Sequence, residues 1–423
     1  MNKREVFKDL AIYSAGNYIS QGLGMISGFL LRMFLEPYHM GIWQGLNIIK
    51  SYSNYTNLGV SKSAAREIAY SRGKGDVERS ESLKNTGFTF SVITVSVVGI
   101  GCILFALFKR NTLDIYVFWG LIAMGVIIVA VRMESYIVTI LRAKKVFFPE
   151  SLGKVINAVL YIGLIYLVVK NFKLYGLYAV NTAVILCSIL ILIFLSKEHF
   201  RFFLRKEELK HLIKVGIPLV LLGFMFVNLT NIDRIVVIKM LGAEKLGIYS
   251  VAIMMGNIIY NVSNMASVVL YPRFQEIYGK NDDKREVYRV MQKIIKLIWF
   301  PLIILVLCGV VFLPYLVEIL IPKYIAGITS MRILLCGIFF LSLSIFYRNY
   351  LVTINKQIIS LFICIGVVIL NLILNIIFVK IGLSIEGVAL ATSMSYFIYF
   401  VALFTAASYI TRKDGYTIVP INP

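Results

Sequence analysis

The chain has 423 residues, of which 59% are hydrophobic and only 15% are charged, and its mean hydropathy is +0.82. Soluble domains carry roughly 25% charged residues, so this composition excludes a soluble globular protein. The formal net charge of +21 would indicate nucleic acid as the partner of a soluble chain. Here, however, the basic residues stand in short segments between apolar runs, where insertion into a membrane explains them. We therefore expect a lipid bilayer, and no nucleic acid, as the partner.

Long apolar stretches recur along the chain, and each can cross a hydrocarbon core of about 30 Å as a helix. Within lipid, backbone N–H and C=O groups must pair inside their own segment, which favours helices. The alternating pattern that marks the strands of a membrane β-barrel is not visible. We predict an all-α integral membrane protein with about twelve spans. The predicted spans are 10–34, 40–60, 86–108, 115–140, 152–170, 174–195, 213–240, 247–270, 294–320, 325–348, 357–379 and 384–409.

The loops between the predicted spans differ in basic charge on alternate sides of the membrane. If the N-terminus is cytoplasmic, the cytoplasmic segments contain 30 Lys and Arg residues and the external loops contain seven. Because cytoplasmic loops carry the excess of positive charge, we expect a multi-pass protein with both termini in the cytoplasm. No loop is long enough for a folded soluble domain, which argues against an extramembrane catalytic domain.

Two pairs of segments repeat at nearly the same spacing. The pairs are 35–43 with 241–249, and 174–179 with 385–390. The chain therefore divides into two halves of six spans, and we expect an N-terminal bundle at 1–205 and a C-terminal bundle at 206–423. An even number of spans gives both halves the same orientation. Paired repeats with a site between them are typical of transporters.

Several predicted spans have polar residues on one helical face. In the first span, the spacing of Asn17, Gln21 and Arg32 places all three on the same side. The second span and the equivalent eighth span carry further amides. Such amides either bond between helices within a bundle or line a water-filled lumen, which their helical spacing on both related helices favours. The predicted lining residues are Asn17, Gln21, Gln44, Asn47, Asn54, Asn257 and Asn261.

Basic residues also stand within the apolar spans or at their ends. A charged side chain near the bilayer centre costs at least about 2.5 kcal/mol, so each should face protein or water. Arg32 and Arg332 lie toward outer ends, where snorkelling to the interface is the alternative explanation. Because deep cations outnumber deep carboxylates, we predict a cationic lumen that binds an anion, and Arg is suited to phosphate. The predicted anion-binding residues are Arg32, Lys50, Arg132, Arg234, Arg332 and Arg348.

Asp233 is one of the few acidic residues at depth. It adjoins Arg234, and it either neutralises a basic residue on another helix or binds a coupling ion, H⁺ or Na⁺. The three histidines lie in or beside loops without metal-ligand spacing, and no Walker A sequence is present. We therefore expect no catalytic residues, no metal site and no cofactor.

Four segments then form a recognisable pattern, and one of them contains Asn-Leu-Gly-Val at 57–60. The segments are 32–76, 231–250, 271–274 and 387–392. Together they resemble the polysaccharide transporter (Wzx-type oligosaccharide flippase) family of the MATE-like flippase superfamily. The resemblance extends over essentially the whole chain, although each motif is degenerate.

This resemblance implies two six-helix bundles around a central lumen in the bacterial cytoplasmic (inner) membrane. The implied activity is transfer of undecaprenyl-diphosphate-linked oligosaccharide from the inner to the outer leaflet by alternating access, for O-antigen of lipopolysaccharide, capsule or a related polysaccharide. The implied partners are this lipid-linked oligosaccharide and the polymerase and chain-length proteins of the same pathway. Two alternatives stay open. A MATE-type cation-coupled multidrug exporter shares the architecture, whereas a membrane glycan polymerase or ligase typically has a sizeable external loop, which this chain lacks.

Overall fold

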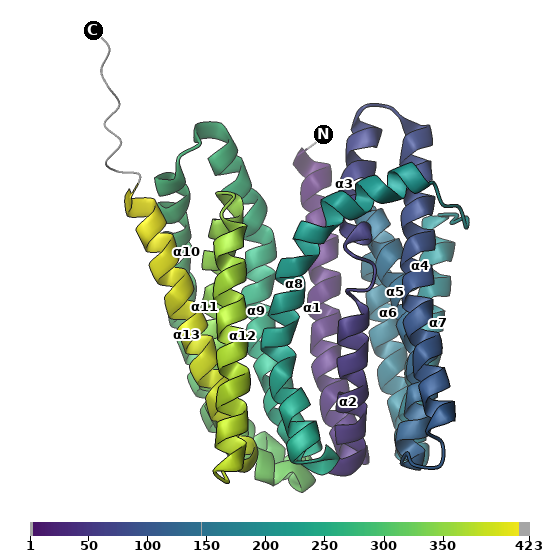
Figure 1. The fold of residues 1–423 in the computed structure, drawn as a ribbon, viewed down its shortest axis with the longest axis vertical. Helices are drawn as coiled ribbons and strands as arrows, with labels where there is room; N and C mark the ends of the chain where they lie inside the picture. Colours follow the sequence, from purple (N-terminus) through teal and green to yellow (C-terminus); the bar gives the residue numbers. More distant parts are fainter. Residues whose placement is uncertain (1–2, 145, 414–423) are drawn as a thin grey trace. The chain divides into compact units, whose positions relative to one another are not determined.

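The computed structural model describes residues 3–144 and 146–413, and the chain forms two compact units, Met1–Phe224 and Met225–Pro423 (Figure 1). The described residues are almost entirely helical and contain no β-strand. The all-α fold is therefore as predicted. Residues 1–2, 145 and 414–423 lie outside the described residues. Part of the predicted topology, the cytoplasmic position of the two termini, rests on them.

The first unit contains seven α-helices, a short π-helix and the first part of an eighth α-helix. They are α1 (Lys3–Phe34), α2 (Pro37–Ser53), α3 (Val60–Gly73), α4 (Val77–Phe108), α5 (Ile115–Ala143), α6 (Phe148–Leu164), the π-helix η1 (Ile165–Val169), α7 (Lys170–Ser196) and α8 (Lys206–Met240). The second unit contains the rest of α8 and the remaining helices. They are α9 (Ala243–Asn281), α10 (Lys284–Leu320), the 3₁₀-helix η2 (Pro322–Gly327), α11 (Ile328–Thr353), α12 (Gln357–Lys380) and α13 (Ser384–Lys413).

Several helices begin where the sequence supplies a capping residue. The Asp76 side chain accepts a hydrogen bond from the Arg79 N–H at 3.0 Å and starts α4. Asp114 does the same for α5, with the Tyr116 N–H at 2.8 Å. Each carboxylate satisfies an N–H that has no partner inside the helix. Proline occupies the first turn of α2 and of α6, where its missing N–H costs nothing.

Nine segments of the described chain are long and apolar enough to cross a membrane. One of them, Phe148–Ser196, contains both α6 and α7. These two helices lie side by side, since Asn157 Nδ2 donates to Ser188 Oγ at 2.6 Å. Neither α1 nor α2 is among the nine, because α2 has only 17 residues and α1 carries the polar stripe. Each predicted span nevertheless coincides with a helix, and α3 is an additional one.

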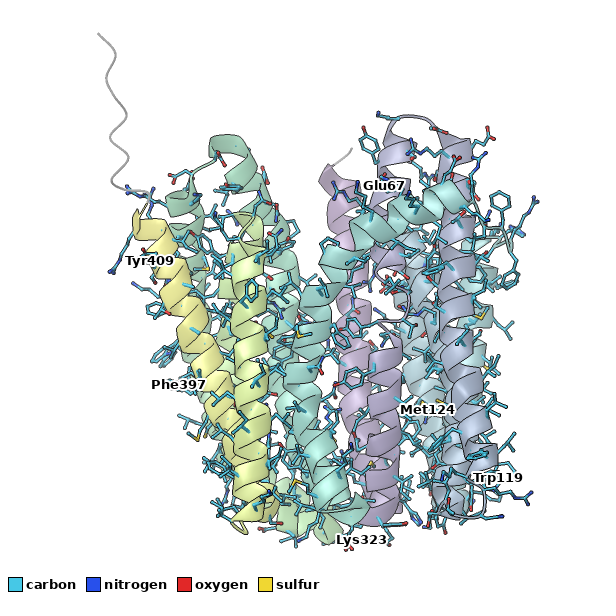
Figure 2. The ribbon with its side chains drawn as sticks, viewed as in Figure 1. Glu67, Trp119, Met124, Lys323, Phe397 and Tyr409 are labelled. Carbon is cyan, nitrogen blue, oxygen red and sulfur yellow. The ribbon has the colours of Figure 1, made fainter. Side chains whose placement is uncertain are left out.

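Large apolar side chains project outward from these helices. Trp119 of α5 and Phe397 of α13 are 48% and 46% exposed, whereas Met124 of α5 is buried (Figure 2). Water would penalise such exposed apolar surface over whole helices, but lipid does not. The chain is therefore a multi-pass membrane protein.

The second predicted span is wrong at its end. We predicted a helix over 40–60, but α2 ends at Ser53 and a turn follows. Leu58 and Gly59 have positive φ angles of 48° and 81°, which no α-helix accommodates. The chain then starts α3 at Val60, a short helix with a polar composition that the apolar pattern did not reveal.

The internal repeat is visible in the backbone. The first pair of repeated segments contains the starts of α2 at Pro37 and of α9 at Ala243, which occupy equivalent positions. In the second pair, the residue just before the repeat has a positive φ in both halves, 51° at Lys173 and 49° at Ser384. A residue with a positive φ thus stands at the first position of α13 and interrupts the start of α7. The two halves share this positive φ as well as sequence.

The first part of α8 packs within the first unit. The boundary between the two compact units therefore falls inside this helix, between Phe224 and Met225. Our predicted boundary was between residues 205 and 206. Ser63 Oγ donates to the Leu212 carbonyl at 2.8 Å, and Tyr55 Oη donates to the Gly223 carbonyl at 2.9 Å. The backbones of Gly59 and Gly216 also approach closely. A Cβ added to Gly59 would lie 2.3 Å from the Gly216 carbonyl oxygen. Only glycine fits this contact.

This contact predicts a stability effect. Gly59→Ala should destabilise the protein by about 1–3 kcal/mol, because it combines a positive φ with a clash against backbone. Thermal unfolding of the purified protein in detergent measures the effect. The control is Gly101→Ala in α4, which has no atom within 4 Å of the added Cβ and should leave stability unchanged or raised. Equal melting temperatures for Gly59→Ala and the wild type would contradict the prediction.

Candidate binding site

A pocket of about 140 Å³ lies inside the second unit, between α8, α9, α11 and α13. Three residues predicted from the sequence, Asp233, Arg234 and Asn257, line it together. Its volume equals about four or five water molecules, enough for a group the size of phosphate. The other lining residues are Phe226, Thr230, Ile253, Tyr260, Leu334, Ile338, Leu341 and Tyr396.

A second predicted cation, Arg348, lies beside this pocket. Its guanidinium is 4.4 Å from the centroid of the Phe226 ring, and it bonds to the Tyr260 hydroxyl. The Phe226 and Tyr260 rings stack on each other with their centroids 6.2 Å apart. A guanidinium that lies over an aromatic ring is held in place by the ring. It stays charged, and its N–H groups at the edge stay available to donate hydrogen bonds. Arg348 of α11 is thereby held against two residues that line the pocket.

Arg234 has no comparable neutralising partner among the described residues, 3–144 and 146–413. Its Nε is buried and has no hydrogen-bond acceptor within that part of the chain. The Asp233 carboxylate is turned elsewhere, because Oδ2 accepts from the Tyr249 hydroxyl at 3.0 Å and Oδ1 accepts from the Arg234 backbone N–H at 2.7 Å. An unsatisfied buried donor is costly, and an anion in the pocket would satisfy it. The arrangement therefore favours anion binding.

Asp233 does not form an ion pair with a basic residue on another helix within the described chain. It is only 3% exposed, and its two described hydrogen-bond partners, a phenol and a backbone N–H, carry no charge. The nearest charge that acts on it is that of its neighbour Arg234. The role of Asp233 as a coupling-ion site stays a prediction.

The three predicted cations of the first unit, Arg32, Lys50 and Arg132, each contact a backbone carbonyl or an aromatic ring of that unit. Arg132 of α5 is 5% exposed, and its Nη2 donates to the Ser53 carbonyl at the end of α2 at 2.9 Å. Arg32 is 4% exposed and donates to the Gly28 carbonyl at 2.9 Å. Lys50 Nζ lies 5.7 Å from the centroid of the Trp43 ring. Each of these three cations therefore contacts groups of the first unit itself.

Arg332, the remaining predicted cation, lies near the start of α11 and is exposed. It does not line the pocket of the second unit. This position fits the snorkelling alternative for Arg332 better than a binding role.

The predicted amides are also dispersed. Asn47 Nδ2 donates to the Trp43 carbonyl of its own helix at 2.8 Å, and Gln44 Nε2 contacts Met40 Sδ at 3.8 Å. Gln21, Asn54 and Asn257 are exposed, and Asn261 is half-buried. Asn17 Oδ1 accepts from Lys154 Nζ of α6 at 2.9 Å. Of the seven amides, Asn257 lines the pocket of the second unit.

The sequence analysis missed the aromatic residues of this site. Phe226, Tyr260 and Tyr396 read as ordinary apolar positions within spans, because one sequence does not show which rings meet. Tyr249, which orients Asp233, stands in the repeated segment 241–249, and that position was the available signal. Lys154 was also missed: it lies in the second turn of α6 and donates to Asn17 of α1.

Two family models match the sequence. The model described as a polysaccharide biosynthesis protein matches residues 6–278, and the MatE model matches residues 218–377. The first match covers well over half of the chain. The chain belongs to the polysaccharide biosynthesis protein family. The family resemblance predicted from the sequence is thus confirmed. No curated protein sequence matches the chain.

Solved structures similar to this member of the polysaccharide biosynthesis protein family include MATE transporters. An inward-facing multidrug resistance MATE family transporter of the MOP superfamily has a TM-score of 0.75 at 14% identity, covering 94% of this chain and 96% of the transporter. A MOP superfamily transporter from Pyrococcus furiosus, described as having a binding pocket of reverse polarity, has a TM-score of 0.63 at 16% identity and 97% coverage of both chains. Similarity at these identities shows a shared fold.

The contact of Arg132 leads to a prediction about stability. Arg132→Ala should cost about 1–3 kcal/mol, because it removes the charged donor to the buried Ser53 carbonyl and leaves that oxygen only the N–H and hydroxyl of Thr56 in its own turn. Thermal unfolding in detergent measures this loss, and Arg132→Lys should recover part of it. The exposed Arg332→Ala serves as the control and should unfold like the wild type. Wild-type stability of Arg132→Ala would show that the bond to Ser53 does not support α2.

Proposed function

We propose that this protein is a flippase for a lipid-linked oligosaccharide whose diphosphate binds at Arg234 and Arg348. The observation that carries the proposal is the position of Arg234 in the lining of a phosphate-sized pocket, where its buried Nε lacks an acceptor in the described chain. The Nε of Arg132 is also buried without an acceptor in the described chain, but Arg132 does not line this pocket. Arg is the side chain best suited to phosphate oxygens, because its planar donors match them in pairs. Membership of the polysaccharide biosynthesis protein family supports a glycan as the rest of the cargo.

The pocket is too small for a sugar chain. At about 140 Å³ it is below the 300–1,000 Å³ that is usual for small-molecule sites. We therefore assign it to the phosphate-bearing group alone, with the glycan and the polyprenyl chain outside it. The exposed Asn257 lines this pocket and offers an amide for hydroxyl groups next to the phosphate. Undecaprenyl diphosphate carrying a repeat unit of O-antigen, capsule or another polysaccharide meets this description.

The direction of transport follows from the charge of this cargo. In the bacterial cytoplasmic membrane, with both termini in the cytoplasm, the potential is negative inside. Outward movement of an anion is then favoured by about 2.3 kcal/mol per charge per 100 mV. Transfer from the inner to the outer leaflet by alternating access uses this gradient. Asp233 stays the candidate for an H⁺ or Na⁺ coupling site in the second unit, and the polymerase and chain-length proteins of the pathway would receive the product.

A MATE-type multidrug exporter is the second candidate. The MatE model matches the part of the chain that contains the Arg234 pocket, and the similar structures include a multidrug resistance transporter. Against it stands the charge of the site, since two arginines and a single carboxylate at or beside the pocket would repel an organic cation. The reverse pocket polarity of the Pyrococcus furiosus transporter indicates that this fold accommodates pockets of more than one charge.

The proposal predicts the effect of removing the two arginines. Arg234→Ala and Arg348→Ala should each slow flipping of a polyprenyl-diphosphate oligosaccharide in proteoliposomes by about ten- to hundredfold, because each removes a charge-assisted hydrogen bond worth about 1.5–3 kcal/mol. Arg234→Lys should retain part of the activity. Arg332→Ala is the matched control, since Arg332 is an exposed arginine outside the pocket.

Two results would contradict the proposal. One is wild-type flipping by both alanine variants at normal protein levels. The other is transport of cationic drugs, measured by resistance of an expressing strain, with no flipping of the polyprenyl-diphosphate substrate. The second result would identify the protein as a multidrug exporter.

A further inference from the structure

A second buried polar cavity lies in the first unit, between α5, α6 and α7. Its volume is about 180 Å³, and it contains two carboxylates, Glu134 of α5 and Glu150 of α6. No residue of the predicted anion-binding set lines it. The cavity therefore shares no lining residue with the Arg234 pocket, and it contains two carboxylates. The other lining residues are Ser135, Val138, Gly153, Lys154, Ser188 and Leu192.

The two carboxylates of this cavity differ in how they are neutralised. The Glu150 side chain is completely buried, and it accepts two bonds from Arg142, from Nε at 2.9 Å and from Nη2 at 2.6 Å. Lys154 Nζ donates to the same carboxylate at 2.6 Å. Glu150 thus has two cationic partners, and its charged form is stabilised by them.

Glu134 has hydroxyl and amide neighbours instead. Its Oε1 accepts from Ser188 Oγ, which in turn accepts from Asn157 Nδ2 at 2.6 Å. Among the side chains that the structure describes, no basic group lies within ion-pair distance of Glu134. The cation that acts on it is Lys154, which Glu150 and Asn17 already engage. Of the two carboxylates of this cavity, Glu134 is therefore the one without an ion pair in the described part of the chain.

The other basic groups of α5 and its C-terminal end are also engaged elsewhere. Toward α2, Arg132 donates to the Ser53 carbonyl. Toward α4 and the segment after α7, Lys144 pairs with Glu81 and Glu198. On α7, the group that faces Glu134 is the uncharged Ser188. The electrostatic neighbours of Glu134 are thus Lys154 and Glu150 of α6.

We propose that Glu134 is a proton-binding site of the first unit. An ionised carboxylate in a membrane interior is costly without a counter-charge, and binding a proton removes that charge. The proton comes from water and binds a carboxylate oxygen, so the acid becomes neutral and the Ser188 hydroxyl keeps a hydrogen-bonding partner. The cavity has room for several water molecules, and the exposed Ser135 on its wall gives them access. The neighbouring Lys154 ammonium would repel a metal cation, which favours a proton as the ligand.

This site provides a way for pH to act on the first unit. Lys154 joins the cavity to α1, because its Nζ bonds both Glu150 and Asn17. When Glu134 loses its proton, the added negative charge competes for Lys154 and weakens the bond to Asn17. Protonation of Glu134 therefore biases the contact between α6 and the polar stripe of α1.

Infrared spectroscopy of the purified full-length protein in liposomes, with no substrate present, tests the proton site. As the pH falls, the wild type should develop the C=O stretching band of a buried protonated carboxyl group. All variants are compared in an Asp233→Asn background, because Asp233 is a second buried carboxyl group without an ion pair in the described chain. In this background Glu134→Gln should lose the band. Glu150→Gln is the matched control, because it removes the ion-paired carboxylate of the same cavity, and it should retain the band. Persistence of the band in Glu134→Gln, or its absence at every pH when Glu134 is present, would overturn the proposal.

A second variant covers failure of Glu134→Gln to fold. Glu134→Asp keeps a titratable group but moves it away from Ser188, so the midpoint of the band should shift. An unchanged midpoint would overturn the proposal. No oligosaccharide is present, so this experiment is independent of the proposed flippase activity. If flipping fails but the infrared band is intact, only the transport assignment is refuted. If flipping is normal but the band is absent, only the proton site is refuted.

Discussion

The constraint on which the structure depends is the absence of water from the bilayer interior. Every backbone N–H and C=O group there must be paired within the protein, which is why long apolar segments form helices. The same constraint applies to the polar side chains that these helices carry. A buried charge without a partner is unstable, so each intramembrane charge in this chain is either bonded to the protein or reserved for a ligand.

The two units meet this constraint in different ways. In the first unit, Arg32 and Arg132 donate to carbonyl groups, and Glu150 has two cationic partners. These charges support packing. The Nε atoms of Arg132 and Arg234 are both buried without an acceptor in the described residues, but Arg234 of the second unit lines a pocket, beside aromatic rings that fix Arg348. Such incomplete satisfaction is expected where a ligand completes the site.

The proposed functions use the two kinds of exception. An anion completes the hydrogen bonding of Arg234, and a proton removes the charge of Glu134. The first gives a binding site for the phosphate groups of a lipid-linked glycan, and the second makes the first unit responsive to pH. They lie in separate units, so either can act without the other. A transporter that moves an anion outward needs the anion site at Arg234. Coupling to the proton gradient through the first unit would need the proton site at Glu134.

Hydropathy by itself determined the fold class and the positions of the apolar helices, because burial in lipid imposes a strong local pattern. The two-fold repeat came from two pairs of similar segments, and the family came from the resemblance of four segments. The end of α2 was missed, since the turn at Leu58 and Gly59 is stabilised by the distant Gly216. Only the tertiary structure decided which charges matter. Arg132 and Arg234 look alike in sequence, but one meets the carbonyl of Ser53 and the other lines a pocket. Partner identity depends on helix packing, and that packing is not a local property of the chain.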